Sequence, residues 1–231
     1  MNLLLLYTFG MCSNKEFKTL GKSKMKNDVL YYITNPFCPW CWAFAPVIDN
    51  LSSFLPEEIP IRYIMGYLSQ NTKKVITSEQ KEMQKQAWRN VSEVSEVKFN
   101  FKFWEDHNPK KITDLGYRAV VAVEFQQFGA SVEMFNAIQY AYFVEAKNIF
   151  ELNTLTQIVG EIGLDRDLFV EDIFSDKTKI RYKKELALCD YLEANKTPTL
   201  ILNYNDSILW INYGYQSEKV VIDLLNSALL A

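Results

Sequence analysis

The stretch VLYYITNPFCPWCWAFAPVIDNL, residues 29–51, decides the fold of this chain. Its first six residues, VLYYIT, are rich in β-branched and aromatic side chains and predict a buried strand, which Asn35 and Pro36 end. From Pro39 onward the spacing becomes helical, and the apolar positions are Trp42, Ala45, Val47, Ile48, Leu51 and Leu55, with Pro56 closing the segment. Two cysteines, Cys38 and Cys41, therefore stand at a strand-to-helix junction.

This junction suits thiol chemistry. A sulfur at a helix N-terminus lies near unpaired backbone N–H groups and the positive end of the macrodipole, which favour the thiolate and lower a cysteine pKa from about 8.5. We therefore expect Cys38 to be the nucleophile. Pro39 costs little in the first turn, where its missing N–H would be unpaired anyway. Cys41, one turn later on the same face, can reach back as the resolving thiol, and Pro46 is predicted to kink the helix behind it.

The segments after the junction extend this pattern. Residues 59–65, IPIRYIM, predict a second strand, so strand, helix and strand form a βαβ unit with a right-handed crossover. The following sequence predicts helices at 78–97, 115–128, 131–146, 151–162, 166–174 and 177–194. Helix starts are expected at Thr77 or Ser78 for the first, Asp114 for the second and Asn153 or Thr154 for the fourth.

The C-terminal part returns to strands. Residues 199–203 and 207–213 predict a hairpin, and the segment after Gly214 predicts an amphipathic helix whose inward positions are Val220, Ile222, Leu224, Leu225 and Leu229. The order predicts an α/β fold, βαβ then ββα, split by a large helical insertion. Its expected parts are a poorly ordered leader at 1–26, a first half at 27–66, an insertion at 67–194 whose last helix can pack on the sheet, and a second half at 195–231.

Composition limits the classes of function. With 231 residues and 48% hydrophobic content, the chain can bury a core. Its 25 basic and 28 acidic residues give a net charge of −3 without a basic block, so we expect no nucleic-acid partner. Four cysteines are too sparse for a disulfide scaffold, and a single histidine, His107, offers no zinc-binding spacing. We expect neither a bound metal nor a bound cofactor.

The N-terminal run MNLLLLYTFGMC is apolar but lacks a basic region before it and a small-residue cleavage site, and it is too short to span a bilayer. We expect no stable membrane span and a cytoplasmic location. Export to the periplasm is the alternative if the run acts as a signal. Translation could also start at Met25, just before the first strand.

The motif CPWC with Pro46 behind it, together with TPT at 197–199, resembles the active site of the thioredoxin superfamily. Helices between the two halves resemble its DsbA-like branch. Within that branch the chain is similar to a bacterial group described as DsbA-family proteins or predicted protein-disulfide isomerases, on the stretches TNPFCPWCWAFAPVI at 34–48, WRNV at 88–91, LGYRAVVAVE at 115–124 and IQYAYFVEAKNI at 138–149.

This resemblance implies a thioredoxin fold with a mixed four-stranded sheet and a redox site at Cys38 and Cys41. It implies a cis bond before Pro198, with the Thr197 backbone binding an extended substrate beside Pro39 and Trp40. A plain strand-entry turn is the other interpretation of TPT. DsbA carries a histidine between its cysteines where this chain has Pro39 and Trp40, so we expect a weaker oxidant.

Thioredoxins also carry a buried acid six residues before the nucleophile, where this chain has Tyr32. Deprotonation of Cys41 would then depend on water or on an unidentified base. The sequence offers no candidate for that base, because Asp49, on the active helix, is expected to be a solvated helix residue.

The predicted function is that of a thiol-disulfide oxidoreductase or isomerase acting on disulfides of proteins, peptides or small thiols. It would need an unidentified redox partner, with glutathione as a candidate co-substrate. The alternative is a glutathione-dependent transferase or isomerase of the kappa or hydroxychromene-carboxylate type, groups that typically place serine where Cys38 stands. A third hypothesis is a binding module that uses the Thr197 and Pro198 groove without redox chemistry.

Other conspicuous residues have structural interpretations. We expect Trp88 and Trp104 to pack within the helical block and His107 to lie in a loop. Cys189 is expected to be a buried small hydrophobe, with a third redox thiol as the alternative. The aromatics Phe37, Trp42 and Phe44 fit either an apolar rim of the site or its core.

Overall fold

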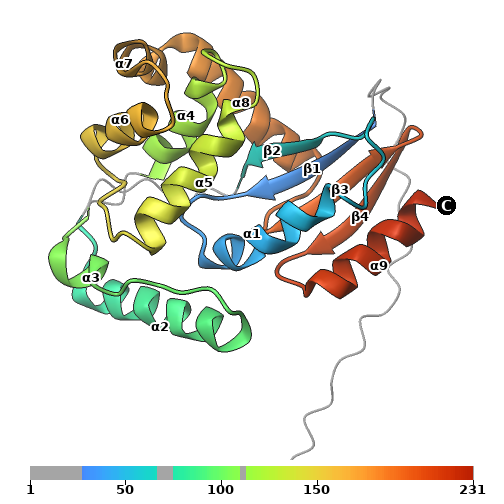
Figure 1. Ribbon diagram of the computed structural model, residues 1–231, viewed down its shortest axis with the longest axis horizontal. Coiled ribbons are helices and arrows are strands. Elements are labelled where there is room, and N and C mark those ends of the chain that lie inside the picture. The colour runs from blue at the N-terminus through green and yellow to red at the C-terminus, as the bar shows by residue number, and fades with distance from the viewer. Residues whose placement is uncertain (1–27, 67–74, 110–112, 231) are drawn as a thin grey trace, which may run out of the picture.

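The computed structural model describes residues 28–66, 75–109 and 113–230. The expected leader, including Cys12, lies outside these residues. The described chain forms a four-stranded sheet in the order β2-β1-β3-β4, from β1 (Val29–Thr34), β2 (Ile61–Met65), β3 (Thr199–Tyr204) and β4 (Ser207–Tyr213) (Figure 1). β1 is parallel to β2 and antiparallel to β3, and β3 is antiparallel to β4. The predicted mixed sheet with an inserted helical block is confirmed.

Helices cover both faces of the sheet. On one face lie α1 (Pro39–Leu51) and α9 (Glu218–Leu229), whose buried Phe44 and Leu225 join a core with Leu30, Tyr32 and Leu202. On the other face α8 (Asp176–Tyr191) packs through Cys189 against strand residues of opposite parity, Tyr31, Ile33, Ile64 and Ile201. Because successive strand residues point to opposite faces, β1 supplies both cores and is buried along its whole length.

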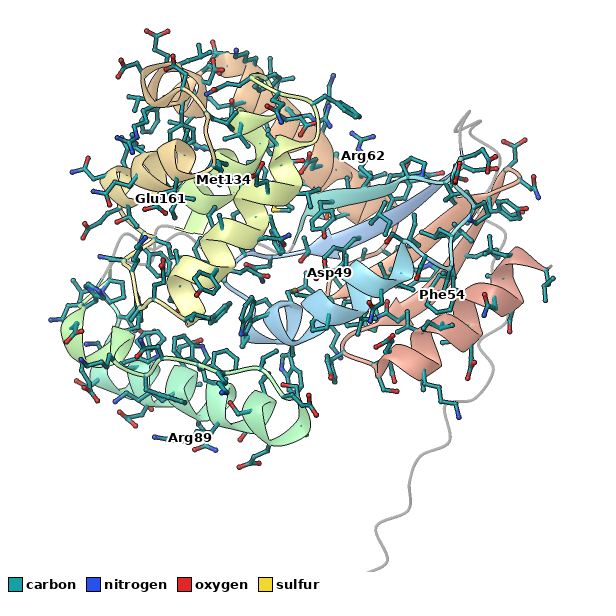
Figure 2. All side chains as sticks on the ribbon, in the orientation of Figure 1. Asp49, Phe54, Arg62, Arg89, Met134 and Glu161 are labelled. Atoms are coloured by element: carbon teal, nitrogen blue, oxygen red, sulfur yellow. The ribbon has the colours of Figure 1, made fainter. Side chains whose placement is uncertain are left out.

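In the insertion between β2 and β3, the elements that the structure describes are all helices, and apart from α8 they gather at one end of the sheet (Figure 1). Its helices are α2 (Ser78–Val94), α3 (Phe103–Asp106), α4 (Thr113–Val123), α5 (Ala130–Phe143), α6 (Leu152–Glu161), α7 (Arg166–Phe174) and α8. Figure 2 shows Met134 of α5 inside this block, where it is fully buried. The short helix α3 was not predicted, because a single turn is too brief to display apolar periodicity.

Several predicted boundaries need correction. α4 already includes Thr113, so Asp114 lies in its first turn rather than at its cap. α6 begins at Leu152 after Glu151, which gives no side-chain cap, so neither Asn153 nor Thr154 starts it. α1 ends at Leu51 and does not continue to Leu55. Local signals locate a helix but do not fix its first and last residues.

The inward face of α9 also differs from the expected one. Val221 and Leu225 are its buried positions, whereas Val220 and Leu224 are 40% and 45% exposed. The apolar side chains wrap around more than half of this helix, so periodicity alone could not decide which stripe faces the sheet.

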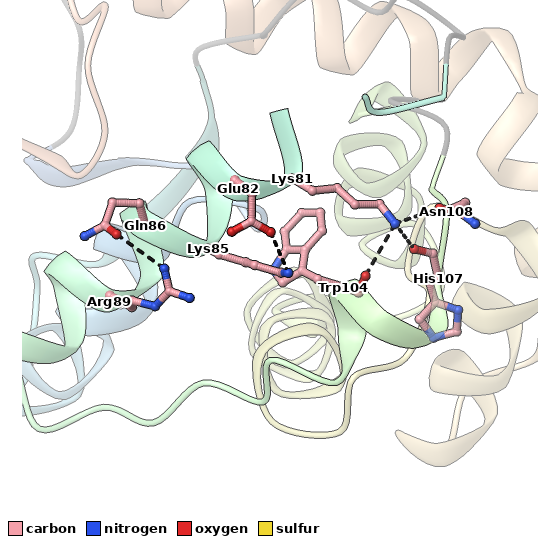
Figure 3. Close-up of polar contacts among 8 residues, drawn as sticks. All are labelled: Lys81, Glu82, Lys85, Gln86, Arg89, Trp104, His107 and Asn108. Carbon is pink, nitrogen blue, oxygen red and sulfur yellow. Dashed lines mark hydrogen bonds and ion pairs between the residues drawn. The ribbon is translucent and has the colours of Figure 1, made fainter. Parts of the chain in front are cut away.

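The helix α2 is fixed to α3 by polar contacts at its N-terminal end. Thr77 and Gln80 form a capping box, and the Lys81 ammonium donates to the carbonyl oxygens of Trp104 and His107 and to Asn108 Oδ1 (Figure 3). Trp88 and Trp104 are buried as predicted. The His107 ring pairs its Nε2 with the Ala146 carbonyl oxygen at 2.9 Å, so this histidine joins the loop after α3 to the segment that follows α5.

No helix in the described part of the chain has both the length and the apolarity to cross a membrane.

Candidate redox site

The turn between β1 and α1 is fixed by Asn35. Its side-chain Oδ1 accepts from the Phe37 backbone N–H at 2.8 Å, and its carbonyl oxygen accepts from the Cys38 N–H at 3.1 Å. An asparagine that folds its side chain back onto the backbone two residues later makes a stable sharp turn. The chain thereby leaves the buried strand and enters α1 with Cys38 as the N-cap residue and Pro39 at the first helical position.

Cys38 has the environment expected of a reactive thiol. It is half-buried, whereas Cys41 one turn later is fully buried, and both are free thiols. The pKa of Cys38 is lowered to about 7, and the largest cause is the Cys41 thiol, which acts as a hydrogen-bond donor. The Thr197 side chain and the backbone N–H groups of Cys41 and Trp40 contribute to the lowering, and burial of Cys38 opposes it. The stabilising groups are thus a thiol, a hydroxyl and helix N-terminal amides.

The pKa of Cys41 moves the opposite way. Burial raises it well above its ordinary value, and the neighbouring Cys38 raises it further. The opposite pKa shifts suit two different roles. The accessible Cys38 ionises near neutral pH, as a nucleophile must, and the buried Cys41 stays protonated in the reduced protein.

The Thr197–Pro198 segment faces the nucleophile from the other half of the fold. Its peptide bond is cis, as the resemblance to the thioredoxin superfamily implied. The Cys38 thiol donates to the Thr197 carbonyl oxygen at 3.9 Å, and the Gly214 N–H donates to the Pro198 carbonyl oxygen at 2.8 Å. Within the described residues the Thr197 backbone N–H donates to no group. The structure therefore brings Cys38, Cys41, Thr197 and Pro198 together from opposite ends of the sequence.

Aromatic side chains surround this pair. Trp40 is half-buried, and its ring lies 5.3 Å from that of Tyr215, which follows β4. Tyr215 in turn packs edge-on against the buried Phe44. Trp40 and Tyr215 thus form one partly exposed apolar surface beside Cys38. Phe44 belongs to the core, and Tyr215 escaped sequence analysis because nothing in its local pattern relates it to α1.

The residue before the nucleophile is held by the insertion. The Phe37 ring stacks on Phe150 at 5.1 Å and packs edge-on against Tyr117 and Tyr142. Tyr117 is fully buried, and its hydroxyl also hydrogen-bonds the Asn35 side chain. Trp42 packs outside this cluster, stacking on Phe143 and donating from Nε1 to the Lys98 carbonyl oxygen at 3.2 Å. The helical block therefore shapes the turn that carries Cys38.

Cys189 and Asp49, the two other residues considered for a role in the redox chemistry, lie away from the site. Cys189 is buried on the opposite face of the sheet, where burial raises its pKa to about 12, with Glu185 and Asp190 adding to the rise. Asp49 is exposed on α1, as expected. The described residues contain no group of three or more His, Cys, Asp or Glu side chains placed to hold a metal ion.

Comparison with curated proteins finds relatives of low identity. The chain is 24% identical over 207 residues to the ClpXP adapter protein SpxH of Bacillus subtilis, covering 85% of this chain and 67% of the relative. It is 22% identical over 204 residues to the SpxH of Halalkalibacterium halodurans, covering 86% and 66%. This chain thus spans about two thirds of the length of these adapters.

Solved structures share the fold. A Nitrosomonas europaea structure described as that of "a putative protein disulfide isomerase" has a TM-score of 0.78 at 24% identity, covering 89% of this chain and 98% of its own. The cytosolic disulfide reductase DsbM from Pseudomonas aeruginosa has a TM-score of 0.73 at 19% identity, covering 88% and 100%. A second DsbM structure, with GSH, has a TM-score of 0.71 at 18% identity.

The family follows from a match over most of the sequence. The family model described as Thioredoxin matches residues 31–217, which include most of β1, the cysteine pair, the helical insertion and the hairpin. The protein is therefore a member of the thioredoxin family with a DsbA-like helical insertion.

Proposed function

We propose that this protein is a thiol-disulfide oxidoreductase or isomerase in which Cys38 is the nucleophile and Cys41 the resolving thiol. The observation that carries the proposal is the placement of Cys38 at the N-terminus of α1, opposite the cis Thr197–Pro198 bond, with its pKa lowered to about 7. A thiol with that pKa is substantially ionised at neutral pH, and the thiolate is the attacking species.

The reaction proceeds by two displacements. The Cys38 thiolate attacks one sulfur of a substrate disulfide, forms a mixed disulfide and releases the other sulfur as a thiolate that takes up a proton. Cys41 then loses its proton and attacks the Cys38 sulfur. The Cys38–Cys41 disulfide forms, the bond to the substrate breaks, and the substrate has gained the two electrons that the pair has lost. Run in reverse, the same steps oxidise a substrate dithiol.

Substrate binding is proposed for Thr197, Pro198, Pro39 and Trp40. The half-buried Thr197 has a backbone N–H without a partner in the described chain and a carbonyl oxygen beside Cys38. An extended peptide could pair with this backbone as an added strand. The partly exposed surface of Trp40 and Tyr215 would bind apolar side chains next to the disulfide. Protein and peptide disulfides are therefore the proposed substrates.

Glutathione is proposed as the small thiol that reduces the pair, since a similarly folded reductase was solved with GSH. We also propose a cytoplasmic location, because that reductase is described as cytosolic. The glutathione-transferase alternative gains no support from the site, because such an enzyme activates bound glutathione itself and has no need of a second thiol, whereas this chain carries both Cys38 and Cys41.

Binding to a protein partner is a second candidate function, favoured by the name of the curated relatives, ClpXP adapter protein SpxH. The two functions make different demands on the cysteines, since an adapter needs a surface and an oxidoreductase needs both thiols.

Insulin reduction with glutathione as electron donor tests the main proposal. We expect turnover by the wild-type protein, none by Cys38→Ser, and a stalled mixed disulfide in Cys41→Ala. Equal rates for the wild type and Cys38→Ser would overturn the proposal. Retention of partner binding in that variant would then favour the adapter function.

A further inference from the structure

The resolving thiol poses a problem of acid–base chemistry. Cys41 is fully buried, and burial raises its pKa, yet it must become a thiolate before it can attack the mixed disulfide. Two carboxyl groups are among the buried polar residues of the described chain, Asp172 and Glu185. Asp172 pairs with Lys177 at 2.6 Å in the insertion, and Glu185 accepts from the Met65 N–H at 3.0 Å. Neither is available to Cys41 as a base.

Two hydroxyl groups, those of Tyr32 and Thr34, lie in the part of β1 where thioredoxins carry a buried acid. Tyr32 and Thr34 lie two residues apart on β1, so they point to the same face of the sheet as α1. Both side chains are almost completely buried, at 1% and 0% exposure. In the dithiol state neither hydroxyl makes a hydrogen bond of ordinary length and angle in the described chain. Buried hydroxyls without partners are costly, which makes two adjacent ones conspicuous.

The Thr34 hydroxyl is next to the Cys41 sulfur, and the Tyr32 hydroxyl is next to Thr34. The backbone N–H of Asn35, the next residue along, also points at the Cys41 sulfur. Thr34 and Asn35 together present two donors where negative charge would develop on Cys41. These donors come from the end of β1, and Gly66 fixes that end through its N–H bond to the Thr34 carbonyl oxygen at 3.0 Å.

We propose that the Thr34 hydroxyl is a catalytic group of the second displacement, donating a hydrogen bond to the Cys41 sulfur as it becomes a thiolate. Tyr32 is a positioning residue that orients the Thr34 hydroxyl. This inference rests on the proposed oxidoreductase function. It gives Thr34 the role of helping Cys41 to ionise, a role for which this chain lacks the buried acid of thioredoxins. The Cys41 proton goes to water, the Cys41 sulfur bonds to the Cys38 sulfur, and the departing thiolate carries away the electron pair of the broken bond.

Donation fits the site better than proton abstraction does. Burial raises the pKa of Tyr32 well above its ordinary value, so a phenolate base is not available there. A preorganised donor stabilises charge where it develops and needs no reorganisation at the moment of reaction. A hydroxyl left unpaired in the resting state is free to serve in this way.

The experiment is stopped-flow reaction of the reduced full-length protein with 5,5′-dithiobis(2-nitrobenzoate). Attack by Cys38 releases one thionitrobenzoate, and attack by Cys41 on the mixed disulfide releases the second. The two steps therefore appear as separate phases on the same trace. Thr34→Val removes the hydroxyl but keeps the β-branched shape of the side chain.

We expect Thr34→Val to slow the second phase about tenfold, equivalent to about 1.4 kcal/mol, with the first phase unchanged. Thr34→Ser should restore the second phase, and Tyr32→Phe should slow it about threefold, as expected of a group acting through Thr34. Tyr182→Phe is the matched control, because it also removes a buried unpaired hydroxyl, but one in the insertion, and should change neither phase.

A second phase within twofold of wild type in Thr34→Val would overturn the inference, and so would equal slowing of both phases. If the valine variant does not fold, Thr34→Ala gives the same comparison. Failure of the oxidoreductase proposal would be recognised by a different result. If the first phase persisted in Cys38→Ser, Cys38 would not be the attacking thiol.

Discussion

Phe37, which immediately precedes the nucleophile, packs directly on Gly116 of the helical insertion. A Cβ added at Gly116 would lie 2.4 Å from the Phe37 Cζ atom and within 3.3 Å of two further atoms of the ring. No aromatic ring tolerates an approach that close. The absence of a side chain at Gly116 is therefore what lets the insertion hold the turn that carries Cys38.

Gly116→Ala should displace the Phe37 ring and destabilise the protein by about 1–3 kcal/mol, the usual cost of overpacking a buried contact. It should also change the rate at which iodoacetamide alkylates Cys38, because the ring and the nucleophile are adjacent. Denaturant unfolding and alkylation kinetics measure the two effects.

The matched control is Gly160→Ala in α6. A Cβ there meets the end of the Arg166 side chain, which can move away, and alanine favours a helix more than glycine does. This variant should therefore be as stable as the wild type or up to about 1 kcal/mol more stable, with unchanged alkylation. Similar behaviour of the two variants would show that the Phe37 contact does not constrain the turn.

The pH dependence of Cys38 alkylation follows from its lowered pKa. The rate should rise with pH around a midpoint near 7 and level off above it, because only the thiolate reacts. In Cys41→Ala the midpoint should move up, since the Cys41 thiol is the largest stabilising group. A wild-type midpoint near the ordinary cysteine pKa of about 8.5 would contradict this description of the site.

The same shift predicts a stability effect in the reduced protein. Cys38 has a lower pKa folded than unfolded, so its contribution to folding is fully present above the unfolded pKa and decreases as pH falls toward 7. Unfolding of reduced wild type and Cys38→Ser across this range should show a difference that grows with pH. A constant difference would exclude the linkage.

The surface formed by Trp40 and Tyr215 should contribute to substrate binding. Tyr215→Ala is expected to lower kcat/KM for insulin reduction by about five- to tenfold through KM, since burying an aromatic side chain contributes about 1–3 kcal/mol. Iodoacetamide, which has no peptide to bind, should alkylate Cys38 at the wild-type rate. Phe128→Ala is the control, because Phe128 is 96% exposed and lies in the insertion. Equal effects of the two substitutions would remove this surface from the binding site.

Cys189 should take no part in the redox chemistry. It is buried on the face of the sheet opposite α1, and burial raises its pKa to about 12. Cys189→Ala should therefore reduce insulin at the wild-type rate. Peptide mapping after mild oxidation provides a second check, in which a disulfide containing Cys189 would contradict the assignment.

The sequence predicts the parts of the site whose signals are local. The strand, the CPWC segment and the Thr-Pro step all lie within short motifs, and their arrangement follows from the strand and helix order. The remaining contacts are tertiary. Thr34 resembles any strand residue until α1 places Cys41 against it, and Tyr215 gains its role only because β4 ends beside α1. The close approach of Phe37 to Gly116 likewise joins segments with unrelated local patterns.

The central claim is that Cys38 and Cys41 form one redox couple. It is tested most directly by equilibrating the protein in glutathione buffers of varied redox ratio and locating its disulfides by mass spectrometry. The account predicts a single two-electron transition that yields the Cys38–Cys41 disulfide and disappears in either single-cysteine variant. A pair that stays reduced at every ratio, or a disulfide that joins one of these cysteines to a different residue, would contradict it.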